Sequence, residues 1–93
     1  MWIRSQDKEL IVEVNVVFLG INWGEDEDYP IKTRLNKHPY FLGSYSTKEK
    51  ALKVLDMLEQ CVSGFTDDET DEFYQYGVFR MPLDSEVEDD ENN

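Results

Sequence analysis

The chain contains one cysteine and one histidine, and it has no long apolar run. A lone Cys61 excludes a disulfide within the chain and a zinc site built from four cysteines. The longest apolar stretch, residues 16–19, is far shorter than the roughly 20 residues that cross a bilayer. The first residues lack the basic segment, apolar run and cleavage site of a secretory signal. We therefore expect a cytoplasmic protein that does not contact membranes.

Bases are also scarce, and the acids that outnumber them are unevenly placed. The chain has 21 Asp and Glu residues against nine Lys and Arg residues, which gives a net charge of −12. The sequence outside three base-free acidic runs carries six acids and all nine bases, so the body of the protein is slightly basic. The runs hold the other fifteen acids: Glu25, Asp26, Glu27 and Asp28; Asp67, Asp68, Glu69, Asp71 and Glu72; Asp84, Glu86, Glu88, Asp89, Asp90 and Glu91.

Acidic runs of this kind have a simple role and a specific one. They keep a small protein soluble, and they repel nucleic-acid phosphates, so we do not expect direct binding of DNA or RNA. They also suit a partner protein that carries a basic groove. The composition alone leaves both roles open.

The length of 93 residues suits one domain, and the pattern of residues predicts an α+β fold. Short β-branched and aromatic runs bounded by turn residues predict an antiparallel β-meander of about five strands. These runs are residues 2–4, 10–14, 16–21, 30–35, 40–45 and 76–81.

One amphipathic helix is predicted over residues 47–62, packed on one face of the sheet. Ser46 or Thr47 can cap it, and Gly64 is a natural end. Residues 84–93 contain a single apolar side chain and predict an acidic disordered tail, which leaves residues 1–83 as the domain. The apolar positions at helical spacing are Ala51, Val54, Leu55, Leu58 and Val62.

Three separated segments carry a resemblance: the opening Met-Trp-Ile-Arg-Ser-Gln-Asp, residues 40–56, which read YFLGSYSTKEKALKVLD, and Met81-Pro82. In this order they resemble a group of small uncharacterised proteins of Gram-positive bacteria, their phages and integrated elements. The resemblance implies a shared fold and a mobile-element setting, and it implies no catalytic activity. The acids at 25–28 and 67–72 depart from that framework.

No pattern of catalytic or ligand-binding residues emerges. His38 lies in a predicted turn, and Cys61 lies beside the apolar stripe without activating cations. The run from Asp67 to Glu72 lacks the central glycine of a calcium loop, and the five glycines are too scattered to cradle a phosphate. We therefore expect a protein that is not an enzyme and has no catalytic residue, metal or cofactor.

Recognition is the remaining class of function. Trp23 and Tyr29 flank the first acidic run, and Phe73, Tyr74 and Tyr76 follow the second. Aromatic side chains anchor interfaces while charge steers the encounter, although these rings also suit a core. The predicted partner-binding residues are Trp23, Glu25, Asp26, Glu27, Asp28, Asp67, Asp68, Glu69, Asp71 and Glu72.

Two hypotheses follow from the charge and the resemblance. In the first, a phage or mobile element encodes an acidic inhibitor that imitates DNA and binds a basic, nucleic-acid-binding host protein, such as a CRISPR effector or a restriction enzyme. In the alternative, the chain is a small non-catalytic accessory or structural interaction module whose acidity serves solubility. Convergence of the acidic runs on one face would favour the first.

Overall fold

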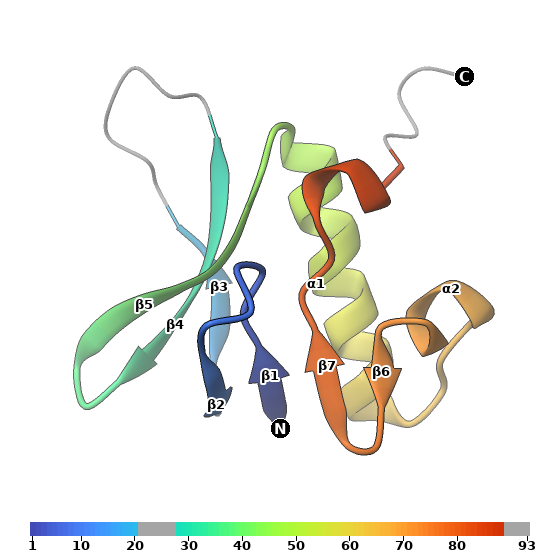
Figure 1. Cartoon of the computed structure of the whole chain (residues 1–93), viewed down its shortest axis with the longest axis horizontal. Coiled ribbons are helices and arrows are strands. Elements are labelled where there is room, and N and C mark those ends of the chain that lie inside the picture. The colour runs from blue at the N-terminus through green and yellow to red at the C-terminus, as the bar shows by residue number, and fades with distance from the viewer. Residues whose placement is uncertain (21–27, 89–93) are drawn as a thin grey trace.

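A computed structural model describes residues 1–20 and 28–88, and it confirms the α+β class (Figure 1). Seven strands accompany one long helix, one short helix and one 3-10 turn. In chain order they are β1 Trp2–Arg4, β2 Ile11–Glu13, β3 Val17–Leu19, β4 Tyr29–Leu35, β5 His38–Tyr45, α1 Lys48–Ser63, α2 Asp68–Asp71, β6 Tyr74–Gln75, β7 Val78–Arg80 and η1 Asp84–Glu86.

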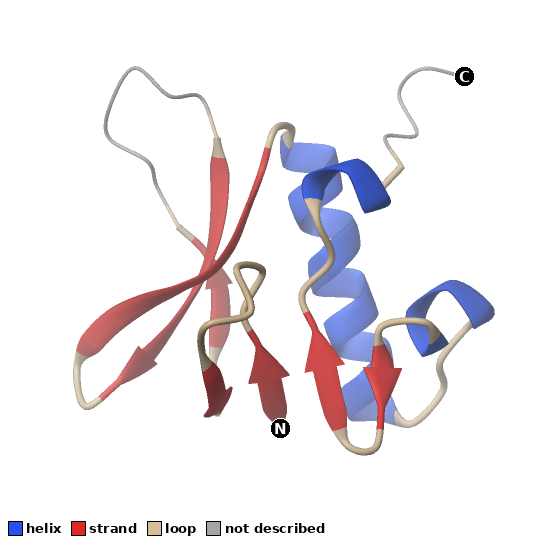
Figure 2. Ribbon diagram, viewed as in Figure 1, coloured by secondary structure: helices blue, strands red, loops and turns tan. Residues whose placement is uncertain are grey.

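The strands form two sheets rather than one (Figure 2). The three-stranded sheet β3-β4-β5 is an antiparallel meander, as expected. The four-stranded sheet has the order β2-β1-β7-β6, and in it β1 and β7 pair in parallel. A parallel pair needs a long crossover connection, and here most of the chain lies between the two strands. The first and last strands of the sequence run side by side in consequence.

Both sheets share one core with α1. Ile3 and Phe79 enter it from the four-stranded sheet, and Ile31 and Leu42 enter it from the three-stranded sheet. Figure 1 shows α1 passing behind β6 and β7. In β1 and β2 the alternate side chains are exposed on the opposite face. In the described part of the chain, no helix is long and apolar enough to span a bilayer.

The helix begins and ends close to where the sequence predicts. The Thr47 hydroxyl caps it by accepting a hydrogen bond from the Lys50 amide at 3.1 Å, and Gly64 ends it with a φ of 85°. A left-handed residue at this position favours glycine. The capping residue is thus Thr47 rather than Ser46, and Ser46 is used elsewhere.

The buried face of α1 differs from the prediction at three positions. Val62 is 76% exposed, because it borders an apolar hollow beside Val14 and Val17 instead of the packed core. Leu55 is only partly buried, and Met57, which the periodicity did not single out, is buried. Ala51, Val54 and Leu58 are buried as predicted.

The domain extends beyond the expected boundary at residue 83. Asp84–Glu86 form η1, and the side chain of Val87 is 2% exposed within the core. The first residues of the expected tail therefore pack on the domain, because their one apolar side chain finds a buried position. Residues 89–93 lie outside the described part of the chain.

Truncating Leu58 to Ala should lower the free energy of unfolding by about 2–5 kcal/mol, because it removes a buried side chain and leaves a cavity. Leu52→Ala is the matched control on the same helix, since Leu52 is 42% exposed, and it should cost less than about 1 kcal/mol. Urea denaturation measures both values. Equal losses would show that the assigned buried face of α1 is wrong.

Candidate functional site

The first acidic run lies almost entirely outside the described residues. Trp23, Glu25, Asp26 and Glu27 belong to the part that is not described, so their contact with a partner stays a prediction. Asp28, the last acid of the run, is exposed and directly precedes β4. It is the one acid of this run that the structure places.

The second run forms α2 and the residue that caps it. Asp67 Oδ1 accepts a hydrogen bond from the Thr70 amide at 2.8 Å. Gln60 of α1 holds Asp67 from the other side: its Oε1 accepts from the Asp67 amide at 2.8 Å, and its Nε2 donates to Oδ2 at 3.3 Å. The bond from the Thr70 amide is the main cause of a lowered pKa at Asp67. Asp67 thus joins α2 to α1.

Two more acids of this run bind within the fold. The Glu69 carboxylate lies 3.2 Å from the ammonium of Lys53 on α1, and the Asp71 carboxylate accepts from the Thr66 hydroxyl. Asp68 and Glu72 differ: both are exposed, and their carboxylates make no hydrogen bond or ion pair with the described residues. Only these two of the five acids are left for a partner.

The aromatic residues near α2 divide between core and surface. Phe73 is buried and Tyr74 is partly buried, as their alternative interpretation allowed. Tyr76 is fully exposed in the turn between β6 and β7, with a φ of 55°. Sequence reasoning missed Phe65, which is 85% exposed between α1 and α2. Its position directly after the helix-ending Gly64 was the available signal.

These exposed residues come from adjoining segments, since α2 contacts both α1 and β6 (Figure 1). We call Phe65, Asp68, Glu72 and Tyr76 the α2 surface. It combines two exposed aromatic rings with two carboxylates that make no hydrogen bond or ion pair with the described residues.

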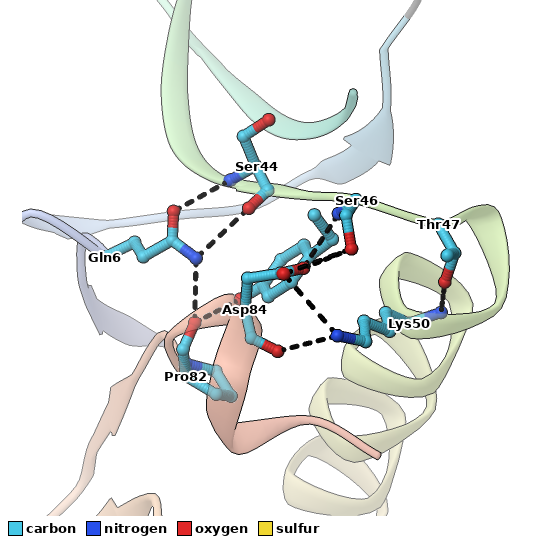
Figure 3. Close-up of polar contacts among 8 residues, drawn as sticks. Gln6, Ser44, Ser46, Thr47, Lys50, Pro82 and Asp84 are labelled. Atoms are coloured by element: carbon cyan, nitrogen blue, oxygen red, sulfur yellow. Dashed lines mark hydrogen bonds and ion pairs between the residues drawn. The ribbon is translucent and has the colours of Figure 1, made fainter. Parts of the chain in front are cut away.

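The third run begins at the other end of α1, where Asp84 binds the residues that start the helix (Figure 3). Its Oδ1 accepts from the Ser46 amide at 2.7 Å, and the Ser46 hydroxyl donates to both carboxylate oxygens at 3.0 Å. The Lys50 ammonium lies 3.4 Å from Oδ2 and donates to the Asp84 carbonyl at 3.0 Å. The bond from the Ser46 amide is the main cause of a lowered pKa at Asp84.

The second and third runs contact α1 at successive positions along its length. Asp84 binds Ser46 and Lys50, Glu69 pairs with Lys53, and Asp67 binds Gln60. Glu86, in the third run, also binds locally: its Oε1 accepts from the Leu83 amide at 2.9 Å. Most described acids of the two runs stabilise local structure.

The segments that carry the resemblance meet beside Asp84. Gln6 Nε2 donates to the carbonyls of Ser44 at 3.1 Å and Pro82 at 3.0 Å, and its Oε1 accepts from the Ser44 amide at 3.0 Å (Figure 3). The buried Tyr45 hydroxyl donates to the same Pro82 carbonyl at 2.7 Å. We call these contacts the Pro82 junction. They are structural contacts that join the start of the chain, β5 and the segment after β7.

Gly43 is required where the chain passes this junction. A Cβ atom there would lie 3.3 Å from Gln6 Cβ, from Met81 Cε and from Tyr45 Oη. Contacts of 3.3 Å on three sides leave little room for a side chain. Gly43 thus permits the close approach of β5 to the two other segments.

The surroundings of Cys61 and His38 differ from those of activated catalytic groups. Burial, with the charge of Asp71 adding to it, raises the pKa of Cys61 to about 11, whereas reactive thiols have lowered pKa values. His38 is exposed at the start of β5. Among residues 1–20 and 28–88, no group of His, Cys, Asp and Glu side chains is placed to hold a metal ion.

Sequence reasoning also missed a basic pocket on the outer face of β1 and β7. Arg4, Lys8 and Arg80 line it. No local signal marks this pocket, because the two arginines come from opposite ends of the chain and meet only through the parallel strand pairing.

The chain has no match among known proteins in any of three comparisons. No protein-family model matches it, and no curated protein or solved structure is similar enough to count as a match.

Asp84→Asn should lower stability at neutral pH by about 1 kcal/mol, because charge-assisted hydrogen bonds weaken and the group is mostly exposed. The pKa of Asp84 is lower in the folded state, so its contribution is present above the unfolded pKa and is lost as pH falls through the folded value. The variant should therefore lose less stability between about pH 5 and pH 2 than the parent. Melting temperatures across this range measure the difference.

Asp56→Asn is the control, since Asp56 is an exposed acid of α1. It should melt like the parent at every pH. If Asp84→Asn also follows the parent, the contacts of η1 with the start of α1 contribute nothing to stability.

Proposed function

We propose that the protein is a non-catalytic, cytoplasmic binding protein of a phage or other mobile element, and that it inhibits a basic, nucleic-acid-binding host protein. The mobile-element setting rests on the resemblance of the three segments that meet at the Pro82 junction. The proposal concerns recognition because the described His and Cys side chains lack the surroundings of catalytic groups.

The α2 surface carries this proposal. Phe65 and Tyr76 expose their rings, and Asp68 and Glu72 carry charges that the fold leaves unpaired among the described residues. Exposing an aromatic ring to water is unfavourable in free energy, and burial at an interface removes this cost. An unpaired acid can bind a basic group of the partner without breaking a bond within the fold. The rings would anchor the complex while the acids steer its formation.

The spacing of the acids is compatible with phosphate mimicry. Residues four apart on a helix lie about 6 Å apart, which approaches twice the rise of about 3.4 Å along the duplex axis for each phosphate of one DNA strand. Asp68 and Glu72 have this separation in the sequence. The predicted contacts of Trp23, Glu25, Asp26, Glu27 and Asp28 with the partner remain part of this proposal.

The alternative function is an accessory or structural interaction module whose acids serve solubility. One observation favours it: Asp67, Glu69, Asp71 and Asp84 all bind groups within the fold. A mimic needs a continuous charged array, whereas local caps and pairs need none.

Capture from a host lysate, followed by binding assays with the purified partner, distinguishes the two functions. Neutralising the α2 surface with Asp68→Asn and Glu72→Gln should slow association several-fold and flatten its salt dependence, because steering depends on charge. Replacing Phe65 and Tyr76 with Ser should instead speed dissociation. A DNA duplex should compete with this protein for the basic groove of the partner.

The matched control neutralises two exposed acids elsewhere, Glu13 on β2 and Asp56 on α1, with Gln and Asn. It removes the same charge and should leave association nearly unchanged. If both pairs of substitutions act alike, or if affinity ignores salt and the aromatic substitutions, the α2 surface is not the contact and the solubility function is favoured.

A further inference from the structure

Two arginines stand side by side on the outer face of the four-stranded sheet. The parallel register places Arg4 of β1 directly opposite Arg80 of β7, on strands about 4.8 Å apart. Their neighbours Ile3 and Phe79 are fully buried, so the arginines project from the other face. Like charges at directly opposed positions repel, and a neutral residue would avoid this cost.

The two arginines line a pocket of about 390 Å³. Lys8 also lines it, so three cations face one acid, Glu86, in a protein of net charge −12. That acid is engaged by the Leu83 amide at 2.9 Å. The pocket is therefore a positive site on an acidic protein.

Backbone carbonyls hold each guanidinium in place. Arg4 donates from Nε at 3.2 Å and from Nη2 at 2.9 Å to the carbonyl of Lys8. Lys8 is a turn residue in the left-handed region, with a φ of 68°. Arg80 donates from Nη2 to the carbonyl of Glu72 at 2.6 Å. A guanidinium has five N–H donors, so each retains donors for a ligand while its orientation is fixed.

Neither arginine is neutralised within the described part of the chain. The ion pairs there join Lys50 to Asp84 and Lys53 to Glu69. A neutral hydrogen-bond donor could anchor each turn to its strand equally well. Structural anchoring therefore does not explain why two positive charges stand at opposed positions. An oxyanion between the two guanidinium groups would relieve their repulsion and accept from both.

The other residues that line the pocket and the volume of the pocket indicate which further group the ligand contains. Phe73 and Met81 are largely buried beneath the pocket, and Leu83 is 45% exposed at its edge. A volume near 390 Å³ is within the range of small-molecule sites and exceeds the need of a phosphate group alone. An organic body attached to the anion would fill the rest.

We propose that this pocket binds a small organic phosphate, with the phosphate group held by Arg4 and Arg80 and the organic body against Phe73, Met81 and Leu83. This site adjoins the α2 surface, because Arg80 donates to the Glu72 carbonyl, but the proposal does not depend on the proposed contact there. Phosphate suits the pair because two guanidinium groups can each donate to different oxygens of one dianion.

Phenyl phosphate is the probe, titrated into the full chain by NMR and calorimetry. It should bind at least tenfold more tightly than phenol, which lacks the anion, and more tightly than inorganic phosphate, which lacks the organic body. Arg4→Gln and Arg80→Gln should each weaken binding by about tenfold or more, because each removes a charged donor. Arg34→Gln is the matched control, since this exposed arginine lies over Phe18 in the other sheet, and it should bind like the parent.

Lys8→Asn tests the pocket independently, in case the arginine variants fail to fold. The Lys8 side chain makes no hydrogen bond in the described structure, and Asn tolerates a positive φ, so this variant should fold and bind several-fold more weakly. Equal effects of Arg34→Gln and Arg80→Gln would overturn the proposal. So would benzoate binding as tightly as phenyl phosphate, or a short oligonucleotide binding where phenyl phosphate does not.

Discussion

The carbonyl of Pro82 is the point on which the fold depends. It accepts hydrogen bonds from Gln6 at 3.0 Å and from the Tyr45 hydroxyl at 2.7 Å, so one buried atom joins the start of the chain, β5 and the segment after β7. Burial is the main cause of a raised pKa at Tyr45, which stays a neutral donor. A buried hydroxyl without an acceptor would cost free energy, so the three segments are stable only together.

This junction fixes where the charged groups lie. The Arg4 carbonyl accepts from the Met81 amide at 3.0 Å beside it, which holds β1 and β7 in the register that brings Arg4 and Arg80 together. The chain then continues from Pro82 into η1, where Asp84 meets Ser46 at the start of α1. Acids therefore bind both ends of α1, while bases gather on the outer face of the sheet.

Local signals in the sequence predicted local structure. The cap, apolar spacing and terminal glycine located α1, because a helix is specified by residues within a turn of one another. The parallel pair, the Pro82 junction and the pocket between Arg4 and Arg80 join distant segments, and no spacing reports them. Val87 was assigned to a tail because a single apolar residue in an acidic run carries no periodicity. Counts of charge likewise could not show that Asp67 caps α2 whereas the neighbouring Asp68 side chain makes no bond.

A double-mutant cycle at the Pro82 junction tests this account most directly. Tyr45→Phe and Gln6→Ala each remove one donor to the Pro82 carbonyl, and Gln6→Ala also removes two hydrogen bonds with Ser44. Each variant should lower the free energy of unfolding by at least about 1 kcal/mol in urea denaturation. Together they leave the buried carbonyl without a partner, so the double variant should lose at least about 0.5 kcal/mol more than the sum of the two. Simple additivity, or single variants as stable as the parent, would contradict the dependence of the fold on this atom.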